Sequence, residues 1–265
     1  MRRVERGAAL LIALGGLALI GALAAAALTL TTGPATRAAA AVERATAERA
    51  AEAAIHRLAL AFTLPAERNR APRDGTVIET NFEGAALVIS AQDALGLINV
   101  NLSDAPTLSR LLVHSGADPA DADELAETWV TTREGLGRNG FATLSAAAAL
   151  ARPELQDVVE TTLDHATIWS GAPGVDPTVA TAPALAAAAN VPLDVAQAFV
   201  ARRTLDGPRT PLPPEVNART LRRSDGRVAR VSVRVETPGG GRASLSVVME
   251  RTTSPRRPII FHAWR

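Results

Sequence analysis

The densest group of potential ligands in the sequence is a run of five acidic residues within ten positions: Asp118, Asp121, Asp123, Glu124 and Glu127. Calcium prefers several carboxylate oxygens, so this run is a candidate calcium site. The alternative is structural, because Asp118 is typical of a helix N-cap and the acids after it favour the positive end of the helix dipole. Both interpretations place the run on one helix.

Catalytic motifs are absent from the sequence. The four histidines are scattered and none has the HExxH spacing: His56, His114, His165 and His262. No Gly-x-Ser-x-Gly elbow and no Gly-x-x-x-x-Gly-Lys phosphate loop occurs. The chain has no Lys and no Cys, which excludes several covalent mechanisms, thiolate metal sites and disulfides. A Ser-His-Asp grouping assembled by folding stays open, so an unrecognised enzyme remains an alternative.

Composition bounds the class of protein. The 265 residues carry a net charge of +1, and 47% are hydrophobic against 21% charged. Such a chain can bury a sizeable core in one or two domains. A nucleic-acid-neutralising protein normally has a strong basic excess, which this chain lacks.

The amino terminus predicts a membrane-spanning helix. Residues 8–36 are 29 uncharged positions, and Arg2, Arg3 and Arg6 precede them. A helix over residues 8–30 would be about 34 Å long, against a hydrocarbon core of about 30 Å. The positive-inside rule then leaves the amino end in the cytoplasm and places everything after Pro34 on the other side of the membrane. A cleaved secretory signal ending near Ala24–Ala27 is the alternative.

Beyond Pro34 the pattern predicts a second stretch of helix, continuous with the first and bent or loosened at that proline. Ala51, Ile55, Leu58 and Phe62 form one apolar stripe. This stripe needs an apolar partner.

Two β-hairpins are the expected partner. Residues 76–80 and 85–91 are β-prone runs around a turn over residues 81–84 (NFEG). Near the carboxyl end, residues 231–236 and 243–250 alternate apolar and polar around the turn 238–241, and residues 258–264 predict a last strand.

Residues 99–217 have helical patterning and predict an insertion built of two helix-hairpin-helix units. In the first, Ser103 is the expected cap, and Leu108, Leu111 and Leu112 face inward up to Gly116. A second helix follows with its apolar face at Ala122, Leu125, Ala126 and Trp129. The second unit repeats the theme with Leu185 and Ala188, a turn at Asn190, and then Val195, Ala198 and Phe199.

The amino terminus resembles type IV pilin-like proteins. Arg6-Gly7 is followed at once by the apolar run from Ala8, which has the form of a prepilin peptidase site. The resemblance implies cleavage after Gly7 and methylation of Ala8. Most pilins carry a glutamate at the fifth mature position, where Ile12 stands here. A carboxylate in lipid without a partner is costly, so its absence fits a subunit with no neighbour above it.

Four later segments resemble the minor pseudopilin K (GspK) family of type II secretion, in the same order along the chain. We call them the landmark segments: residues 96–101 (GLINVN), 141–144 (FATL), 166–171 (ATIWSG) and 261–264 (FHAW). The family binds calcium in its helical domain, but its acidic run around a Trp-Arg-Asp motif is replaced here by residues 131–135 (TTREG). Asp93, Asp104 and Glu134 are weak further candidates.

The expected fold class is α+β, with a long N-terminal helix packed on an antiparallel sheet and a large inserted all-α domain of two SAM-like helix-hairpin-helix units. Expected boundaries are residues 1–7 for the prepilin leader, 8–64 for the helix, 76–98 and 227–265 for the sheet, and 99–226 for the insertion.

The resemblance implies a non-enzymatic minor pseudopilin in the inner membrane, at the tip of the pseudopilus. Its implied partners are the I and J minor pseudopilins and the prepilin peptidase, with exported proteins and the secretin further on, and no nucleic acid. A membrane-anchored DNA receptor is the alternative that helix-hairpin-helix units raise. The acidic run argues against it, because carboxylates repel a phosphate backbone.

Overall fold

The computed structural model describes residues 21–22, 36–64, 71–216 and 221–264. Along the chain, a block of helices with two short strands separates the second strand from the fifth. The strands are β1 (Asp74–Phe82), β2 (Ala85–Asp93), β3 (Ile98–Asn99), β4 (Ala166–Thr167), β5 (Val228–Glu236), β6 (Arg242–Arg251) and β7 (Ile259–Trp264).

Within the described residues, five strands form one antiparallel sheet in the order β1-β2-β5-β6-β7. Both predicted hairpins are present, as β1–β2 and β5–β6, and so is the predicted last strand. The first hairpin turns through Glu83 and Gly84, which have φ values of 50° and 86°. Glycine adopts such angles readily. Asn81 and Phe82, which were expected in the turn, instead belong to β1.

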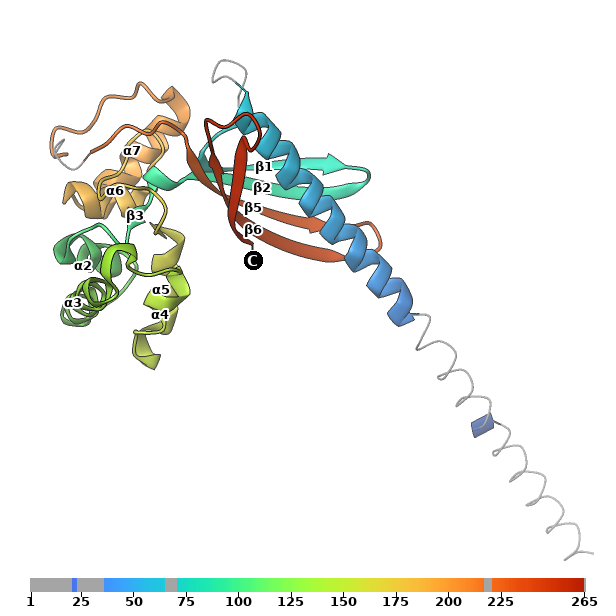
Figure 1. Cartoon of the computed structure of the whole chain (residues 1–265), viewed down its shortest axis with the longest axis horizontal. Helices are drawn as coiled ribbons and strands as arrows, with labels where there is room; N and C mark the ends of the chain where they lie inside the picture. Colours follow the sequence, from blue (N-terminus) through green and yellow to red (C-terminus); the bar gives the residue numbers. More distant parts are fainter. Residues whose placement is uncertain (1–20, 23–35, 65–70, 217–220, 265) are drawn as a thin grey trace, which may run out of the picture.

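The N-terminal helix, described over residues 36–63, crosses one face of this sheet (Figure 1). Its inward side carries small alanines together with Ile55 and Phe62, which are 0% and 3% exposed. Opposite them lie apolar residues that alternate along β2, β5 and β6, including Leu87, Val233 and Met249. Each large side chain buried in this way contributes about 1.5–3 kcal/mol. The predicted apolar stripe therefore does face the sheet, with Leu58 at its half-buried margin.

The turn between β5 and β6 also contacts the helix. Thr237 Oγ1 donates a hydrogen bond of 2.5 Å to Glu43 Oε2. A Cβ atom on Gly241 would lie 2.3 Å from the backbone oxygen of Glu43, and one on Gly239 would lie 2.3 Å from its carboxyl carbon. The glycines of this turn therefore allow the sheet to approach the helix closely.

The helices between β2 and β5 gather at the end of the sheet nearer residue 63, away from residue 36 (Figure 1). The α-helices are α2 (Ala105–His114), α3 (Pro119–Gly135), α4 (Leu144–Ala148), α5 (Gln156–Asp164), α6 (Ala182–Ala189) and α7 (Leu193–Asp206). Short 3₁₀ helices are η1 (Ala94–Gly96), η2 (Gly137–Asn139) and η3 (Pro153–Leu155).

Two of the helix pairs are joined by short turns, α2 with α3 and α6 with α7, and α2 also packs on α6. Their core has the predicted residues of α2 and α3, with Trp129 fully buried and its Nε1–H donating to the oxygen of Ala147 at 2.9 Å. Asn190 ends α6 in the left-handed conformation, at φ 56° and ψ 50°, as predicted. That these pairs are SAM-like helix-hairpin-helix units stays a prediction, and so do the domain boundaries.

Two local predictions were wrong. Asp104, not Ser103, caps α2, because its carboxylate accepts from the Thr107 N–H at 3.0 Å. Ser103 is 1% exposed, and its hydroxyl instead donates to the oxygen of Pro173. On α7, Ala198 is exposed, whereas Arg203 is buried alongside Phe199.

The inward face of α7 therefore includes a charged residue that a hydrophobic pattern omits. Arg203 is 4% exposed and donates to the backbone oxygens of Pro177 and Ala180 at 2.6 and 2.9 Å. Both bonds come from Nη1 and hold the loop that precedes α6 against α7, whereas the buried Nε of Arg203 has no hydrogen-bond partner among the described residues.

Candidate functional site

The predicted processing residues Gly7, Ala8 and Ile12 lie outside the described residues, as does Pro34. Most of the predicted membrane segment lies outside them too. Within the described residues, no helix combines the length and the apolar character that a membrane crossing requires. Cleavage, methylation and membrane insertion stay predictions.

The described part of the N-terminal helix presents a second side to solvent. Val42 and Leu60 are 64% and 67% exposed and lie 18 residues apart, which is five helical turns. They therefore share one side of the helix, opposite the sheet. This exposed side is the part of the described helix that is available to a neighbouring molecule.

The acidic run of α3 is engaged in local pairing. Arg152 forms ion pairs with Asp121 and Glu124, and Ser109 Oγ donates to Asp123 Oδ1 at 2.5 Å. Asp118 stands at the N-cap position of α3, although its side chain accepts no capping hydrogen bond. Among the described residues, no three His, Asp or Glu side chains gather as metal ligands. Three of these acids therefore pair with neighbouring side chains, and the capping hydrogen bond expected of Asp118 is not formed.

The weaker calcium candidates belong to three different elements, although the charges of Asp104 and Glu134 both act on Arg133. Asp104 caps α2, Glu134 is exposed on α3, and Asp93 is buried where β2 ends. Arg133, within the segment that replaces the family motif, donates to the oxygen of Val100 at 2.6 Å. This segment therefore supports the loop after β3.

Two of the four histidines, His165 and His262, line one cleft, whereas His56 and His114 do not line it. The ring of His56, on the N-terminal helix, lies edge-on to the ring of Phe261, with the two ring centroids 5.7 Å apart. Burial lowers the pKa of His114 and of His165, which disfavours the charged form of each ring. His262 bonds to Glu250 on β6.

By contrast, the four landmark segments do come together. Residues 96–101 and 166–171 meet as the two-residue parallel ladder of β3 and β4. Asn99 Nδ2 donates to Ser170 Oγ at 3.0 Å. Asn101 Nδ2 donates to the oxygen of Phe141, and Asn101 Oδ1 accepts from the Phe141 N–H, at 2.9 and 2.8 Å. Two asparagines of the first segment therefore fasten the second and third.

Gly96 has a steric role in the same place. A Cβ atom there would lie 2.3 Å from the backbone oxygen of Val179 and equally close to Gln92 Nε2. Gln92 itself donates to the oxygen of Val179 at 2.8 Å. The close approach of these segments requires glycine at this position.

The fourth landmark segment joins through a chain of side chains. Trp169 stacks on His262, whose Nε2 lies 2.7 Å from Glu250 Oε2. The other oxygen of Glu250 pairs with Arg227 at 2.6 Å. Burial opposes ionisation of Glu250, but the hydrogen bonds and charges of His262 and Arg227 prevail and lower its pKa. This chain connects the helical part of the molecule to the last strands of the sheet.

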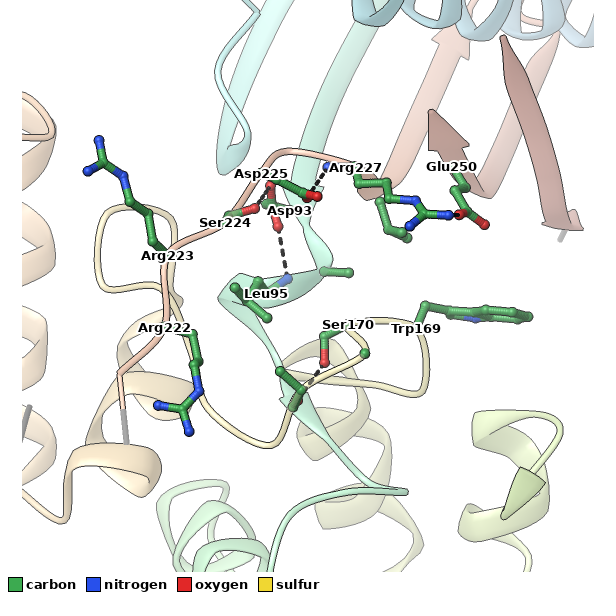
Figure 2. Close-up of a pocket in the computed structure, with 14 residues that line it drawn as sticks. Asp93, Leu95, Trp169, Ser170, Arg222, Arg223, Ser224, Asp225, Arg227 and Glu250 are labelled. Carbon is green, nitrogen blue, oxygen red and sulfur yellow. Dashed lines mark hydrogen bonds and ion pairs between the residues drawn. The ribbon is translucent and has the colours of Figure 1, made fainter. Parts of the chain in front are cut away.

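A cleft of about 480 Å³ lies beside this connection, where the chain leaves the sheet after β2 and returns to it before β5 (Figure 2). Ser224 lies between two buried carboxylates. Its hydroxyl donates to Asp93 Oδ2 at 2.7 Å, and its N–H donates to Asp176 Oδ2 at 2.6 Å. Asp93 also accepts from the Leu95 N–H at 2.9 Å. Asp93 and Asp176 are each 3% exposed.

Burial raises the pKa of Asp93, and the neighbouring Asp176 acts in the same direction. Hydrogen bonds from Ser224 and Leu95 and the charge of Arg73 oppose this shift. The Ser224 hydroxyl also accepts from the Gly226 N–H at 2.9 Å. The Ser224 hydroxyl thus donates one hydrogen bond and accepts another at the junction, by which we mean the place where the sheet meets the helices. None of the described residues that line the cleft is a histidine.

Sequence reasoning missed most of this junction. Asp93 was singled out only as a weak calcium ligand, and Asp176, Ser224 and Arg203 were not singled out. Their partners are far apart in the chain, so spacing holds no signal for them. The sequence offered one clue: Asp93 lies where the first predicted hairpin ends, and Ser224 lies shortly before the second begins.

At the level of sequence, no protein-family model and no curated protein matches this chain. Among solved structures, it is similar to a chain in the crystal structure of the GspK-GspI-GspJ complex from the type 2 secretion system of enterotoxigenic Escherichia coli. The TM-score is 0.52 at 12% identity, and the similarity covers 89% of this chain and 98% of that one. At this identity the likeness concerns the fold.

Proposed function

We propose that this protein is a non-enzymatic minor pseudopilin of a type II secretion system, and that it is of the K type. In this role it lies at the tip of the pseudopilus, with its N-terminal helix in the inner membrane and its folded part in the periplasm. Together with other minor pseudopilins it primes assembly of the filament, which drives folded proteins through the outer-membrane secretin.

One observation carries the proposal: the fold likeness to a chain of the GspK-GspI-GspJ complex extends over nearly the full length of both chains. Because the similarity covers 89% of this chain, it must extend over both the helix-covered sheet and most of the helices between β2 and β5. The four landmark segments add support, since they meet at the junction of the helices with the sheet.

The arrangement in space supports a tip position. In a filament of this kind the N-terminal helices run side by side, and the next subunit would stack beyond the folded part. Here the helices α2–α7 lie at the end of the sheet away from residue 36 (Figure 1). A subunit stacked there would meet this bulk. Together with Ile12 in place of the usual glutamate, this favours a subunit with no neighbour above it.

The proposed partners are the I and J minor pseudopilins, which would pack against the N-terminal helix. The exposed side of that helix, at Val42 and Leu60, is the surface offered to them. The proposed maturation is removal of residues 1–7 by prepilin peptidase and methylation of Ala8.

Co-purification tests the proposal. The full-length chain is co-expressed with the I- and J-type pseudopilins of its own organism, and the complex is isolated through a tag on the J-type protein. We expect a ternary complex, whose mass is measured by light scattering. Recovery of an I–J complex without this chain contradicts the proposal.

Two matched leucine variants show whether the helix makes the contact. Leu60→Glu places a charge on the exposed side of the N-terminal helix and should reduce recovery at least about tenfold, because an unpaired charge is costly in an apolar interface. Leu205 is 86% exposed on α7, so Leu205→Glu should leave recovery unchanged. The reverse pattern would rule out the helix as the shared contact.

A further inference from the structure

A second and larger cleft, of about 910 Å³, lies on the face of the sheet that the N-terminal helix does not cover. Its floor is formed by outward-facing residues of β1, β2, β5 and β6. The opposite wall comes from the helical part of the molecule, with Leu144, Leu163 and Ile168 among its apolar residues. The cleft is thus a trough between two parts of the fold.

The middle of the floor is a row of small side chains that crosses the strands. Strand pairing places Val77, Ser90, Ser232 and Ser246 side by side on β1, β2, β5 and β6. Ser232 Oγ and Ser246 Oγ are 3.3 Å apart and share a hydrogen bond. Three strand spacings of about 4.8 Å make the row about 14 Å long, which is the length of about four residues of extended chain.

Two arginines flank this serine row. Arg230 and Arg234 lie two positions before and after Ser232 on β5, so both face the same side of the sheet as Ser232. Arg230 donates to the backbone oxygen of Leu163 at 3.0 Å and to that of Asp164, which ties the floor to the wall at the end of α5. Arg234 is exposed, and its side chain has no ion pair or hydrogen bond with another described residue.

The charge of the trough is asymmetric. Asp164 is the one carboxylate among the described residues that line it, against the two guanidinium groups. Successive side chains of an extended polypeptide point to opposite sides, so neighbouring acidic residues in the trough would face Arg230 and Arg234. The serine hydroxyls would be available to the peptide groups of such a segment.

We propose that this trough binds an extended, acidic segment of a partner protein. The inference depends on the pairing of the strands and the charges of the lining. It does not require the pseudopilin role.

Three fluorescein-labelled peptides of equal length test it against the purified full-length protein: hexaglutamate, hexaglutamine and hexaarginine. Fluorescence anisotropy at low ionic strength should show hexaglutamate binding at least about tenfold more tightly than the other two, since opposite charges attract across a weakly screened surface. Equal binding of all three peptides, or no binding of hexaglutamate at millimolar protein, overturns the proposal.

Variants then locate the contact. Arg234→Glu should weaken hexaglutamate binding about tenfold or more, because it replaces attraction with repulsion. Arg256, exposed in the turn between β6 and β7, provides the matched control, and Arg256→Glu should change binding less than about twofold. Equal losses from the two variants would mean nonspecific attraction to the whole surface and would overturn the proposal.

A neutral substitution tests the shape of the trough. Ser232→Leu fills the middle of the serine row and leaves every charge in place, so it should abolish hexaglutamate binding. The melting temperature of each variant, compared with that of the parent, identifies any loss of fold. Unchanged binding by a folded Ser232→Leu variant would overturn the trough as the site.

Discussion

The indole ring of Trp169 stacks on the imidazole ring of His262, with ring centroids 4.4 Å apart and planes inclined by 27°. Trp169 follows β4 in the helical part of the molecule, and His262 lies on the last strand of the sheet. Since His262 also bonds to Glu250, the stack links the helices to two neighbouring strands. This contact joins two of the four landmark segments.

The stack should contribute to stability beyond the area it buries. We expect a double-mutant cycle of Trp169→Ala and His262→Ala, measured by urea unfolding of the full-length protein, to give a coupling free energy of about 1 kcal/mol. His262→Phe keeps a ring in place and should retain most of the coupling with Trp169. If the changes in the free energy of unfolding of the two single variants add up to that of the double variant, the rings do not interact.

Asn101 should be needed for its amide and not for its size. Asn101→Leu removes both hydrogen bonds to the backbone of Phe141 and leaves that N–H and C=O without these partners. The free energy of unfolding should fall by about 2–3 kcal/mol. Asn101→Asp keeps an acceptor for the Phe141 N–H but loses the donor, so amide exchange at Phe141 should speed up more in the leucine variant. Equal exchange in both variants would contradict this role.

The turn beside Glu43 offers a test of close packing. Gly241→Ala places a Cβ against the backbone oxygen of Glu43 and should lower the free energy of unfolding by about 3 kcal/mol. Gly240 has φ 83° and open space around its Cβ position. Asparagine tolerates that conformation, so Gly240→Asn should cost less than about 1 kcal/mol. Similar costs at the two positions would mean that the helix does not lie against this turn.

Asp93 should make stability fall as pH rises. Because burial raises its pKa in the folded state, the folded protein holds this proton more tightly than the unfolded chain does. Stability is therefore lost as pH rises from the unfolded value of about 3.9 through the raised folded value. Asp93→Asn cannot ionise, so its free energy of unfolding should rise relative to that of the parent across this window and then level off. A difference that stays flat or falls, in urea titrations at a series of pH values, would contradict the assigned shift.

The sheet and its helix follow from local patterns. Alternation in β5 and β6 predicts the buried face that contains Val233, and the spacing of Ala51, Ile55 and Phe62 predicts the helix side that covers it. Each pattern repeats with one period along a short stretch of sequence, so it can be recognised without knowing which distant residues it will contact. Capping was less predictable, because Ser103 and Asp104 are adjacent potential caps and the choice depends on the distant Pro173.

The junction could not be predicted, because its members are polar residues that meet only after folding. Arg203 lies on a helix whose other buried positions are apolar, and its acceptors belong to a loop that precedes α6. The landmark segments were located by resemblance, yet their contacts became apparent only in three dimensions, through Asn99, Asn101 and Trp169. The processing residues remain predictions from sequence.

The most direct test of the central claim is the mature amino terminus. The full-length chain is expressed with and without prepilin peptidase, and the product is sequenced from its amino end. The pseudopilin role predicts a peptidase-dependent start at Ala8, with the apolar segment still attached to the folded part. A start near Ala27 or Leu28, whether or not the peptidase is present, would mean that this segment is a discarded secretion signal and would contradict the account.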